Sequence, residues 1–373
     1  MKKIRLACPC LFGLEGLVAD ELRQMGYAEV QPENGRVLFS GDETAVARAN
    51  LGLRCAERVM VLLAEFEARS FEELFQGVKG IPWEEWVGRE EAFPVRGWSL
   101  DSQLHSVPDC QAIIKKAAVE HLKQHYRVEW FTETGATLQI RFSILKDRVS
   151  IYLDTSGEGL HKRGYREKSN EAPLKETLAA GMVTLARFYS DRAFCDPMCG
   201  SGTILIEAAM IGMKMAPGLN RRFAAEKWGC LPQGIWRAER SRALDQIDRS
   251  ADFTVAGYDI DPKAVALTAE NAAKAGVGAR VRVSQQPFSD FAPAEERGTL
   301  VCNPPYGERM LEVSEAEALY RQLGEAYRRL PHWRFYVISP SERFESLFGR
   351  KADKRRKLYN GMIRCDFFQY FRH

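Results

Sequence analysis

The sequence has little net charge and no long apolar run. Its 53 basic residues exceed its 50 acidic residues by only three, so any surface for nucleic acid has to be a local patch instead of a cationic tail. No stretch approaches the roughly twenty apolar residues of a membrane span. Residues 1–8 look like a lipoprotein signal, but Arg5 interrupts the apolar run before it reaches about seven residues. We therefore expect a first strand there and no association with a membrane.

Paired cysteine motifs are also missing. The chain has nine cysteines, an odd number, and neither Cys8-Pro-Cys10 nor the Cys195/Cys199 pair has the two-by-two spacing of a zinc site. This pattern favours reduced thiols in a cytoplasmic protein. His121 and His125 have the spacing of metal ligands on a helix, but no acidic partner or third ligand is evident. We interpret them as surface histidines and expect no bound metal.

The 373 residues are enough for two or three domains. With 45% hydrophobic and 28% charged residues, the composition is typical of globular proteins. The first half mixes short strands and helices at a density that indicates two small α+β units in series, over 1–67 and 68–155. A basic, apolar-poor stretch at 156–172 predicts a linker. Strands are expected at 4–7, 36–40, 58–66, 93–99, 138–144 and 149–153, and helices at 14–22, 44–51, 71–78 and 112–122.

The second half, over 173–373, has a different rhythm. After a helix at 174–189, strands alternate with helices, which indicates a parallel, doubly wound α/β sheet. An antiparallel hairpin at 357–359 and 363–371 is expected to close the edge of that sheet. The parallel strands are predicted at 193–196, 255–259, 281–285, 299–302 and 335–339.

A possible cofactor motif follows the first of these strands. The strand ends in Asp196, and a Gly-x-Gly turn at Gly200 and Gly202 opens a helix at 204–210. Glycines there let the backbone approach a ligand and accept positive φ. No Lys-Ser/Thr follows, which argues against a phosphate-binding loop. The next strand ends in Asp259, whose carboxylate can accept the hydroxyls of a ribose, and this feature would also suit an NAD enzyme. For Asp261 we favour a helix cap.

A possible catalytic motif, Asn303-Pro304-Pro305-Tyr306, follows the strand at 299–302. This tetrad suits methylation of a planar amine, whose lone pair is delocalised into its ring. The Asn303 side-chain oxygen and the Pro304 carbonyl can accept the two N–H groups, and two prolines stiffen the loop. Tyr306 supplies a face on which the base can stack.

The three motifs, in this order, resemble class I S-adenosylmethionine (SAM)-dependent methyltransferases of the amino-group type. The wider match, at 8–15, 159–166, 172–176 and 303–309, resembles the bacterial THUMP-domain RNA methyltransferases that modify the guanine N2 amine of large-subunit ribosomal RNA. The resemblance covers nearly the whole chain. It implies a ferredoxin-like domain (1–67), a THUMP RNA-binding domain (68–155) and a Rossmann-like methyltransferase domain (173–373).

Carried over by position, the resemblance implies that Asn303 to Tyr306 hold the base. The chain departs from the family pattern where an acid would meet the adenine amine, since Ser284-Gln285-Gln286 stands there, and Gln286 is the substitute that we assign. Together, the residues assigned to SAM are Asp196, Pro197, Gly200, Ser201, Gly202, Thr203, Asp259, Ile260 and Gln286.

Three basic stretches are candidates for contact with RNA phosphates, and each has aromatic or apolar neighbours suited to looped RNA. We assign four residues of the linker and one residue beyond the catalytic motif to RNA binding. The four linker residues are Lys162, Arg163, Tyr165 and Arg166, and the fifth residue is Arg309. The other two stretches are 221–242, with Trp228 and Trp236, and 351–357. Each stretch is also typical of an ordinary solvated surface.

Other functions fit parts of this pattern. A DNA adenine-N6 methyltransferase or a protein glutamine methyltransferase would use the same catalytic loop, and a non-catalytic RNA-binding protein would use only the N-terminal half. About 150 residues that resemble an RNA-binding module favour RNA. The sequence specifies neither the target nucleotide nor an oligomeric state.

Overall fold

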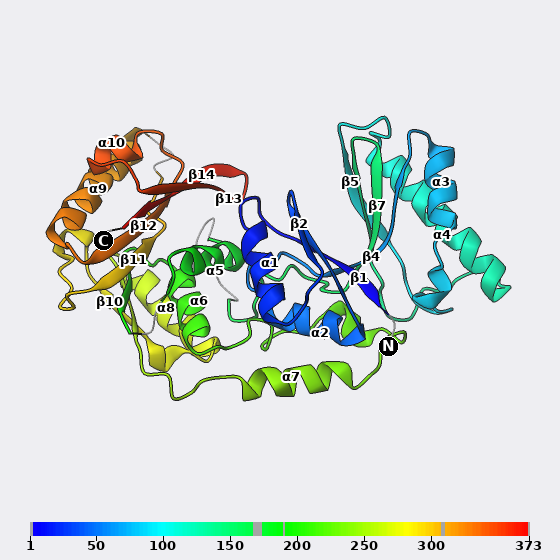
Figure 1. The fold of residues 1–373 in the computed structure, drawn as a ribbon, viewed down its shortest axis with the longest axis horizontal. Helices are drawn as coiled ribbons and strands as arrows, with labels where there is room; N and C mark the ends of the chain where they lie inside the picture. Colours follow the sequence, from blue (N-terminus) through cyan, green and yellow to red (C-terminus); the bar gives the residue numbers. More distant parts are fainter. Residues whose placement is uncertain (1–2, 167–173, 189–190, 307–309, 372–373) are drawn as a thin grey trace.

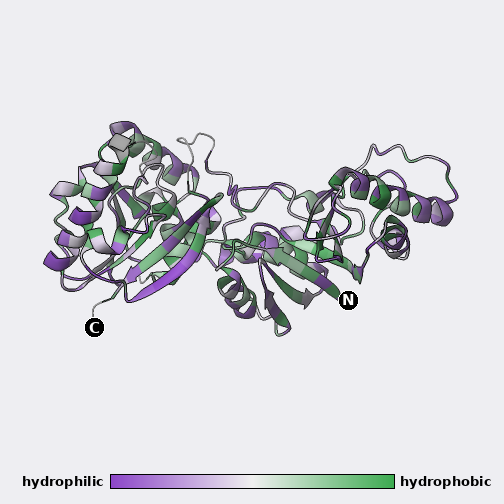
Figure 2. Ribbon diagram, turned by 90° about the horizontal axis from the view of Figure 1, so that it is seen from above, coloured by the Kyte–Doolittle hydropathy of each residue, from purple (hydrophilic) through white to green (hydrophobic). Residues whose placement is uncertain are grey.

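A computed structural model describes residues 3–166, 174–188, 191–306 and 310–371. Each half of the chain is built on its own seven-stranded sheet, and the two sheets lie at opposite ends of an elongated molecule (Figure 1). Figure 2 shows apolar residues in many of the strands and a mixture of hydrophilic and apolar residues along the helices, and one long strand of the C-terminal half is hydrophilic. None of the helices in the described ranges is both long and apolar enough to cross a bilayer.

The N-terminal half forms one continuous sheet. Strand β4 pairs antiparallel with β1 through Leu6 and Val61, and along its other edge it pairs with β7. The two α+β units expected in series therefore share one sheet, because β4, which ends at Glu67, pairs with β1 of the first unit and with β7 of the second. The order is β2-β3-β1-β4-β7-β6-β5, with β1 (Ile4–Pro9), β2 (Val30–Glu33), β3 (Arg36–Gly41), β4 (Met60–Glu67), β5 (Val95–Leu100), β6 (Ile140–Leu145) and β7 (Arg148–Asp154).

Four helices cover this sheet, and local signals set where they begin. The Asp42 carboxylate caps α2, and Ser70 with Glu73 forms a capping box at the start of α3. Helix α1 buries Val18 and Leu22 and is followed by Gly26 at φ +95°. The helices are α1 (Glu15–Gln24), α2 (Glu43–Gly52), α3 (Phe71–Lys79) and α4 (Val107–Tyr126).

The C-terminal sheet has the predicted doubly wound form. Its order is β10-β9-β8-β11-β12-β14-β13, with five parallel strands and an antiparallel hairpin at one edge. The strands are β8 (Ala193–Asp196), β9 (Val255–Asp259), β10 (Val281–Gln285), β11 (Gly298–Cys302), β12 (Trp333–Ser339), β13 (Lys354–Asn360) and β14 (Ile363–Tyr370). The helices are α5 (Glu176–Leu185), α6 (Thr203–Gly212), α7 (Ile235–Asp245), α8 (Pro262–Lys274), α9 (Met310–Arg329) and α10 (Phe344–Phe348).

The long insertion between β8 and β9 packs against the N-terminal half. Helix α7 lies along α2 (Figure 1), and Arg48 binds both Glu239 carboxylate oxygens at 2.9 and 2.8 Å. The indole N–H of Trp228 donates to the Thr137 carbonyl at 3.1 Å. Trp228 and Trp236 are buried, so the prediction that these aromatics offer faces to RNA is wrong, and the insertion instead joins the two halves.

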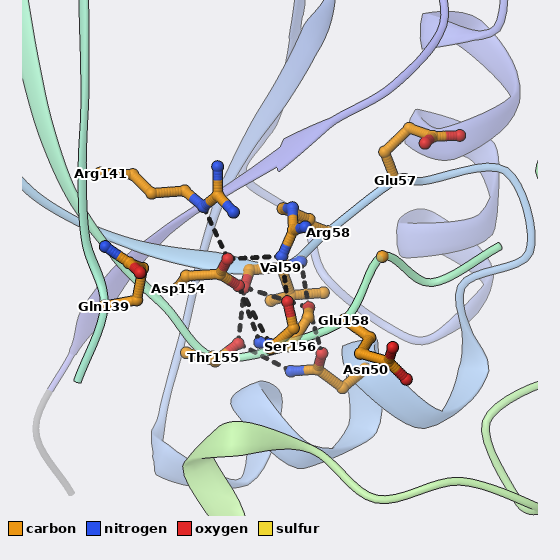
Figure 3. A network of polar contacts seen from close by, with 12 residues as sticks. Asn50, Glu57, Arg58, Val59, Gln139, Arg141, Asp154, Thr155, Ser156 and Glu158 are labelled. Carbon is orange, nitrogen blue, oxygen red and sulfur yellow. Dashed lines mark hydrogen bonds and ion pairs between the residues drawn. The ribbon is translucent and has the colours of Figure 1, made fainter. Parts of the chain in front are cut away.

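A polar network fixes the end of β7, where the second half of the chain begins (Figure 3). Buried Asp154 accepts from Arg58 at 2.5 Å and from Arg141 at 2.6 Å. Asn50 on α2 donates to the Thr155 hydroxyl at 2.8 Å. The network ties α2, β4, β6 and β7 to one point, so the chain leaves the N-terminal sheet in a fixed direction.

The cysteines and histidines fit the sequence analysis in part. None of the nine cysteines, all of which lie in the described ranges, forms a disulfide, and eight of them are buried. His121 has an acidic partner that the sequence did not indicate, because its Nε2 lies 2.6 Å from a Glu84 carboxylate oxygen. The part of the chain that the structure describes contains no group of three metal-ligating side chains.

Candidate functional site

The carboxyl edge of the C-terminal sheet gathers the predicted cofactor and catalytic residues. In a parallel sheet the carboxyl ends of neighbouring strands lie at one edge, where ligands bind. Asp196 ends β8, Asp259 ends β9, and Asn303 follows β11. Strands β8 and β11 are neighbours, with Cys195 paired to Leu300. Asp196 and Asn303 are about a hundred positions apart in the sequence, but they lie at the ends of adjacent strands.

The turn after β8 depends on its two glycines. Gly200 has φ +54° and Gly202 has φ +80°, both in the left-handed region. A Cβ on Gly202 would lie 2.5 Å from the Thr268 side chain, so this glycine lets α6 pack closely on α8. A Cβ on Gly200 would meet no atom within 4 Å. The turn therefore leaves open space beside Gly200 for a ligand.

Asp259 holds this turn in place. One carboxylate oxygen accepts the Gly200 N–H at 2.8 Å, and the other accepts the Asp261 N–H at 3.0 Å. The neighbouring Ile260 side chain is 70% exposed, an apolar surface beside the carboxylate. Asp261 caps α8 by accepting the Lys263 N–H at 2.9 Å, which confirms the cap that we favoured.

Asp196 is an unusual acid. It is 2% exposed, and its carboxylate accepts the Met198 N–H at 3.2 Å. Burial raises the pKa of Asp196 to about 8; the Met198 hydrogen bond opposes this shift, and the nearby Asp259 charge adds to it. A buried acid beside an open turn suits a ligand that carries hydrogen-bond donors or positive charge.

Gln286 is less free than its assignment requires. Its backbone N–H donates to the Asp259 carbonyl at 2.9 Å, which keeps it at the carboxyl edge. However, its side-chain amide donates to the Asp290 carbonyl at 2.8 Å. The side chain is therefore turned toward the following turn, and a role at an adenine amine would need the amide to leave Asp290.

The catalytic loop is tied together by its own tyrosine. The Tyr306 hydroxyl donates to Asn303 Oδ1 at 2.6 Å and accepts from Asn360 Nδ2 at 3.2 Å. The ring packs against the core, and burial raises the pKa of Tyr306 above its ordinary value. Tyr306 is half-buried, and the stacking of a base on its ring stays a prediction. Pro304 is buried and Pro305 is exposed.

Comparison with known proteins agrees with this geometry. Three family models match the chain in order: the RlmL ferredoxin-like domain over residues 5–60, the THUMP domain over 68–154, and the RMKL-like methyltransferase domain (UPF0020) over 163–369. The last match alone spans more than half of the chain. The chain belongs to the RMKL-like methyltransferase family. This membership confirms the resemblance to the THUMP-domain RNA methyltransferases.

Relatives of this RMKL-like methyltransferase cover its whole length. "Putative RNA methyltransferase YpsC" of Bacillus subtilis (strain 168) is 45% identical over 100% of this chain and 97% of its own. "Ribosomal RNA large subunit methyltransferase K/L" of Cellvibrio japonicus is 32% identical over 98% of this chain but only 50% of its own. The chain thus spans about half the length of the K/L relatives that it matches.

Two solved relatives have the same fold. SMU.472, solved in complex with SAH, has a TM-score of 0.94 at 40% identity, covering 100% of this chain and 99% of its own. A protein of Listeria monocytogenes, described as a predicted N6-adenine-specific DNA methylase, has a TM-score of 0.95 at 44% identity, covering 100% and 97%. SAH is SAM without its methyl group, and the open glycine turn between two acids fits such a ligand. SAM is the cofactor of this methyltransferase.

Most of the residues assigned to RNA are buried in the methyltransferase. Arg163 and Tyr165 are 2% and 1% exposed, and the Arg166 side chain is almost fully buried. They cannot contact RNA from these positions, and the prediction for them is wrong. Lys162 is exposed and pairs with Glu158 at 3.0 Å. Arg309 lies outside the described residues.

The physical reason is a buried partner on α6. Glu207 is fully buried, and its two carboxylate oxygens lie 3.2 and 3.3 Å from the Arg163 guanidinium. The described part of the expected linker, residues 156–166, is therefore a packed segment. Glu207 is the single acid in the apolar helix Thr203–Gly212. A buried acid needs a buried partner, so this residue is the signal by which the pairing could have been found.

Arg166 contacts the cofactor turn, a role that the sequence did not indicate. Its guanidinium donates to the Thr203 hydroxyl at 2.9 Å and pairs with Glu176 at 2.9 Å. Thr203 is the first residue of α6, directly after the glycine turn. Arg166 thus holds the start of α6 against α5 and positions the turn that faces SAM.

Proposed function

We propose that this methyltransferase transfers the SAM methyl group to the exocyclic N2 amine of a guanine in RNA, and that its substrate is large-subunit ribosomal RNA. The observation that carries the proposal is the adjacency of the Asn303 loop and the glycine turn. Cys195, next to the last residue of β8, pairs with Leu300, and Asn303 follows the end of β11. The glycine turn and the Asn303 loop therefore leave neighbouring parallel strands at the same edge of the sheet, where sheets of this kind bind their ligands.

The chemistry of the loop supports an amine as acceptor. An exocyclic amine is a poor nucleophile because its lone pair is delocalised, and acceptors for its two N–H groups turn that lone pair toward the donor. Asn303 Oδ1 and the Pro304 carbonyl are suited to this role. Oδ1 accepts one hydrogen bond from the Tyr306 hydroxyl, and its second lone pair can accept an N–H of the incoming amine. When bound, SAM supplies an activated methyl group, and the protein contributes positioning.

RNA is favoured over DNA by the N-terminal half. The THUMP match covers 68–154, the K/L relatives are named for large-subunit ribosomal RNA, and the insertion with α7 fastens this half to the methyltransferase domain. DNA adenine-N6 methylation is the second candidate, because the loop accepts any exocyclic amine and one solved relative is described in those terms.

The test is transfer of labelled methyl groups from SAM to ribosomal RNA or to duplex DNA. We expect label in the RNA, and mass spectrometry to find N2-methylguanosine that is absent from cells lacking the protein. Asn303→Ala is expected to abolish transfer while SAM affinity stays within about twofold, because Asn303 contacts the base and not the cofactor. Asn34→Ala, at an exposed asparagine of the β2–β3 turn, is the matched control. Label entering only DNA would contradict the proposal.

A further inference from the structure

The β13–β14 hairpin projects beyond the carboxyl edge of the C-terminal sheet. The last pair between β12 and β14 joins Ser339 to Asp366. The first three residues of β14 (Ile363 to Cys365) lie past that pair and still pair with β13. At about 3.4 Å per residue, the hairpin tip extends roughly 10 Å beyond the end of β12. It does so on the side of the sheet where Asn303 emerges.

The tip is fastened to the catalytic loop. Asn360, the last residue of β13, donates to the Tyr306 hydroxyl, and Cys365 Sγ lies 3.8 Å from the same hydroxyl. Gly361 and Met362 form the turn, with Gly361 at φ +62°. Met362 is two residues from Asn360, which is at most about 7 Å of chain. The exposed end of the hairpin therefore directly follows the residue that fastens it to the catalytic loop.

This tip exposes apolar side chains where polar turn residues are the norm. Met362 is 99% exposed and Ile363 is 41% exposed. Phe12, from the N-terminal half, is 56% exposed and lies beside Tyr359 with ring centroids 6.2 Å apart. The Arg356 guanidinium donates to the Gly13 carbonyl at 2.9 Å and so holds the loop that carries Phe12 against the hairpin. Three exposed apolar side chains, from both halves of the chain, thus lie on or against the hairpin that Asn360 joins to the catalytic loop.

The surrounding charge favours nucleic acid as the occupant. Lys357 and Arg364 are exposed on the same hairpin, and cations at such positions neutralise phosphates. A base inside a paired stem has to leave its stack before its amine can reach an active site. Proteins that open stacked bases commonly insert an apolar wedge such as Phe, Ile or Met.

We propose that the hairpin tip is this wedge: Met362 enters the base stack of a paired RNA and fills the space that the target nucleotide leaves, with Ile363 and Phe12 contacting the adjoining bases. The inference rests on the proposed function, since it assumes an RNA substrate. It adds a binding site for the nucleotides next to the target. It also explains why an apolar tip persists at a fully exposed turn.

The test uses the full chain and an RNA stem that carries the nucleotide mapped by mass spectrometry. One stem is fully paired, and a second has a mismatch opposite the target, which lowers the cost of unstacking. We expect Met362→Ala to lower kcat/KM by about tenfold or more on the paired stem and by about twofold on the mismatched stem. Met362→Leu, which keeps an apolar wedge, is expected to retain activity. Leu244→Ala, at a similarly exposed apolar position on α7, is the control.

The outcomes separate the two proposals. An equal loss on both stems, or no loss on either, would overturn the wedge while leaving RNA methylation intact. A wild-type protein that methylates neither stem nor ribosomal RNA would overturn the proposed function itself. SAM affinity is expected to be unchanged in Met362→Ala, and a reduced SAM affinity would indicate a structural role for the tip and contradict the wedge.

Discussion

Removing the Arg163 guanidinium would show directly whether this residue binds RNA or stabilises the fold. The guanidinium pairs with Glu207 and also donates to the carbonyls of Leu160 at 2.8 Å and Arg54 at 2.6 Å. Among the residues that the structure describes, Arg163→Met therefore leaves the buried Glu207 carboxylate with one hydrogen-bond donor, the Tyr165 hydroxyl at 3.4 Å. It also leaves two carbonyls without this donor.

The magnitude follows from the burial. Breaking a buried ion pair by removing one partner costs about 3–5 kcal/mol. For a domain of this size, each kcal/mol lowers the melting temperature by about 2–4 °C. We therefore expect the melting temperature of the methyltransferase domain to fall by roughly 6–20 °C. Removing both partners in Arg163→Met/Glu207→Leu should recover part of this loss, because the double variant has no unpaired buried charge.

The assay is calorimetric unfolding combined with RNA binding in a salt series. Lys162→Met is the matched control, because Lys162 is the exposed neighbour whose pair with Glu158 is worth about 1 kcal/mol or less. The reasoning is refuted if Arg163→Met melts with the wild type. It is also refuted if that variant loses RNA affinity with a shallower salt dependence, which is the signature of a lost phosphate contact.

Three further predictions concern the cofactor turn. Because the folded pKa of Asp196 is about 8, above its ordinary 3.8, the folded state binds an extra proton between these values, and wild-type stability falls by up to about 1.4 kcal/mol per pH unit as the pH rises. The stability of Asp196→Asn lacks this dependence on pH. Without cofactor, its free energy of unfolding relative to the wild type should therefore rise from pH 5 to 8 in calorimetry. A constant difference between the two proteins over this range would disprove the shifted pKa. Arg166→Met removes the nitrogen that contacts both Thr203 and Glu176, and it should weaken SAM binding by about tenfold in titration calorimetry with RNA affinity unchanged. Gly202 has φ +80° and lies against Thr268, so Gly202→Ala should lower the free energy of unfolding by about 1–2 kcal/mol or more. Gly234→Ala is the control and should be neutral, because a Cβ on Gly234 would lie in open space. Equal melting temperatures of the two variants would argue against strain at Gly202.

The sequence predicts well where local pattern determines structure. Strand β8, the glycine turn and α6 were expected because an apolar strand, an acid and two glycines are adjacent in the chain. The antiparallel hairpin at the end of the chain was also expected. Strand β2 was not expected, because its residues Val30–Glu33 are mostly exposed, include a proline and show no apolar alternation.

The sequence predicts poorly where a partner lies far along the chain. The linker arginines looked like a phosphate-binding surface because their partners, Glu207 for Arg163 and Glu176 for Arg166, belong to helices of the next domain. The hydrogen bond from Asn360 to the Tyr306 hydroxyl could not be predicted either, because the two residues are 54 positions apart in the sequence. For the linker arginines, local composition gave the charge correctly, but tertiary packing decided whether solvent reaches it.

The sheet shared by both N-terminal units has a consequence for target selection. Because β4 is hydrogen-bonded along both edges, bending between the ferredoxin-like and THUMP regions would break backbone pairing, so the two regions behave as one rigid unit. An RNA bound at the far end of the THUMP region would bring to Asn303 only those nucleotides that lie at a fixed distance from the bound segment. A protein built in this way can select its target nucleotide by distance, without contacts to the neighbouring bases.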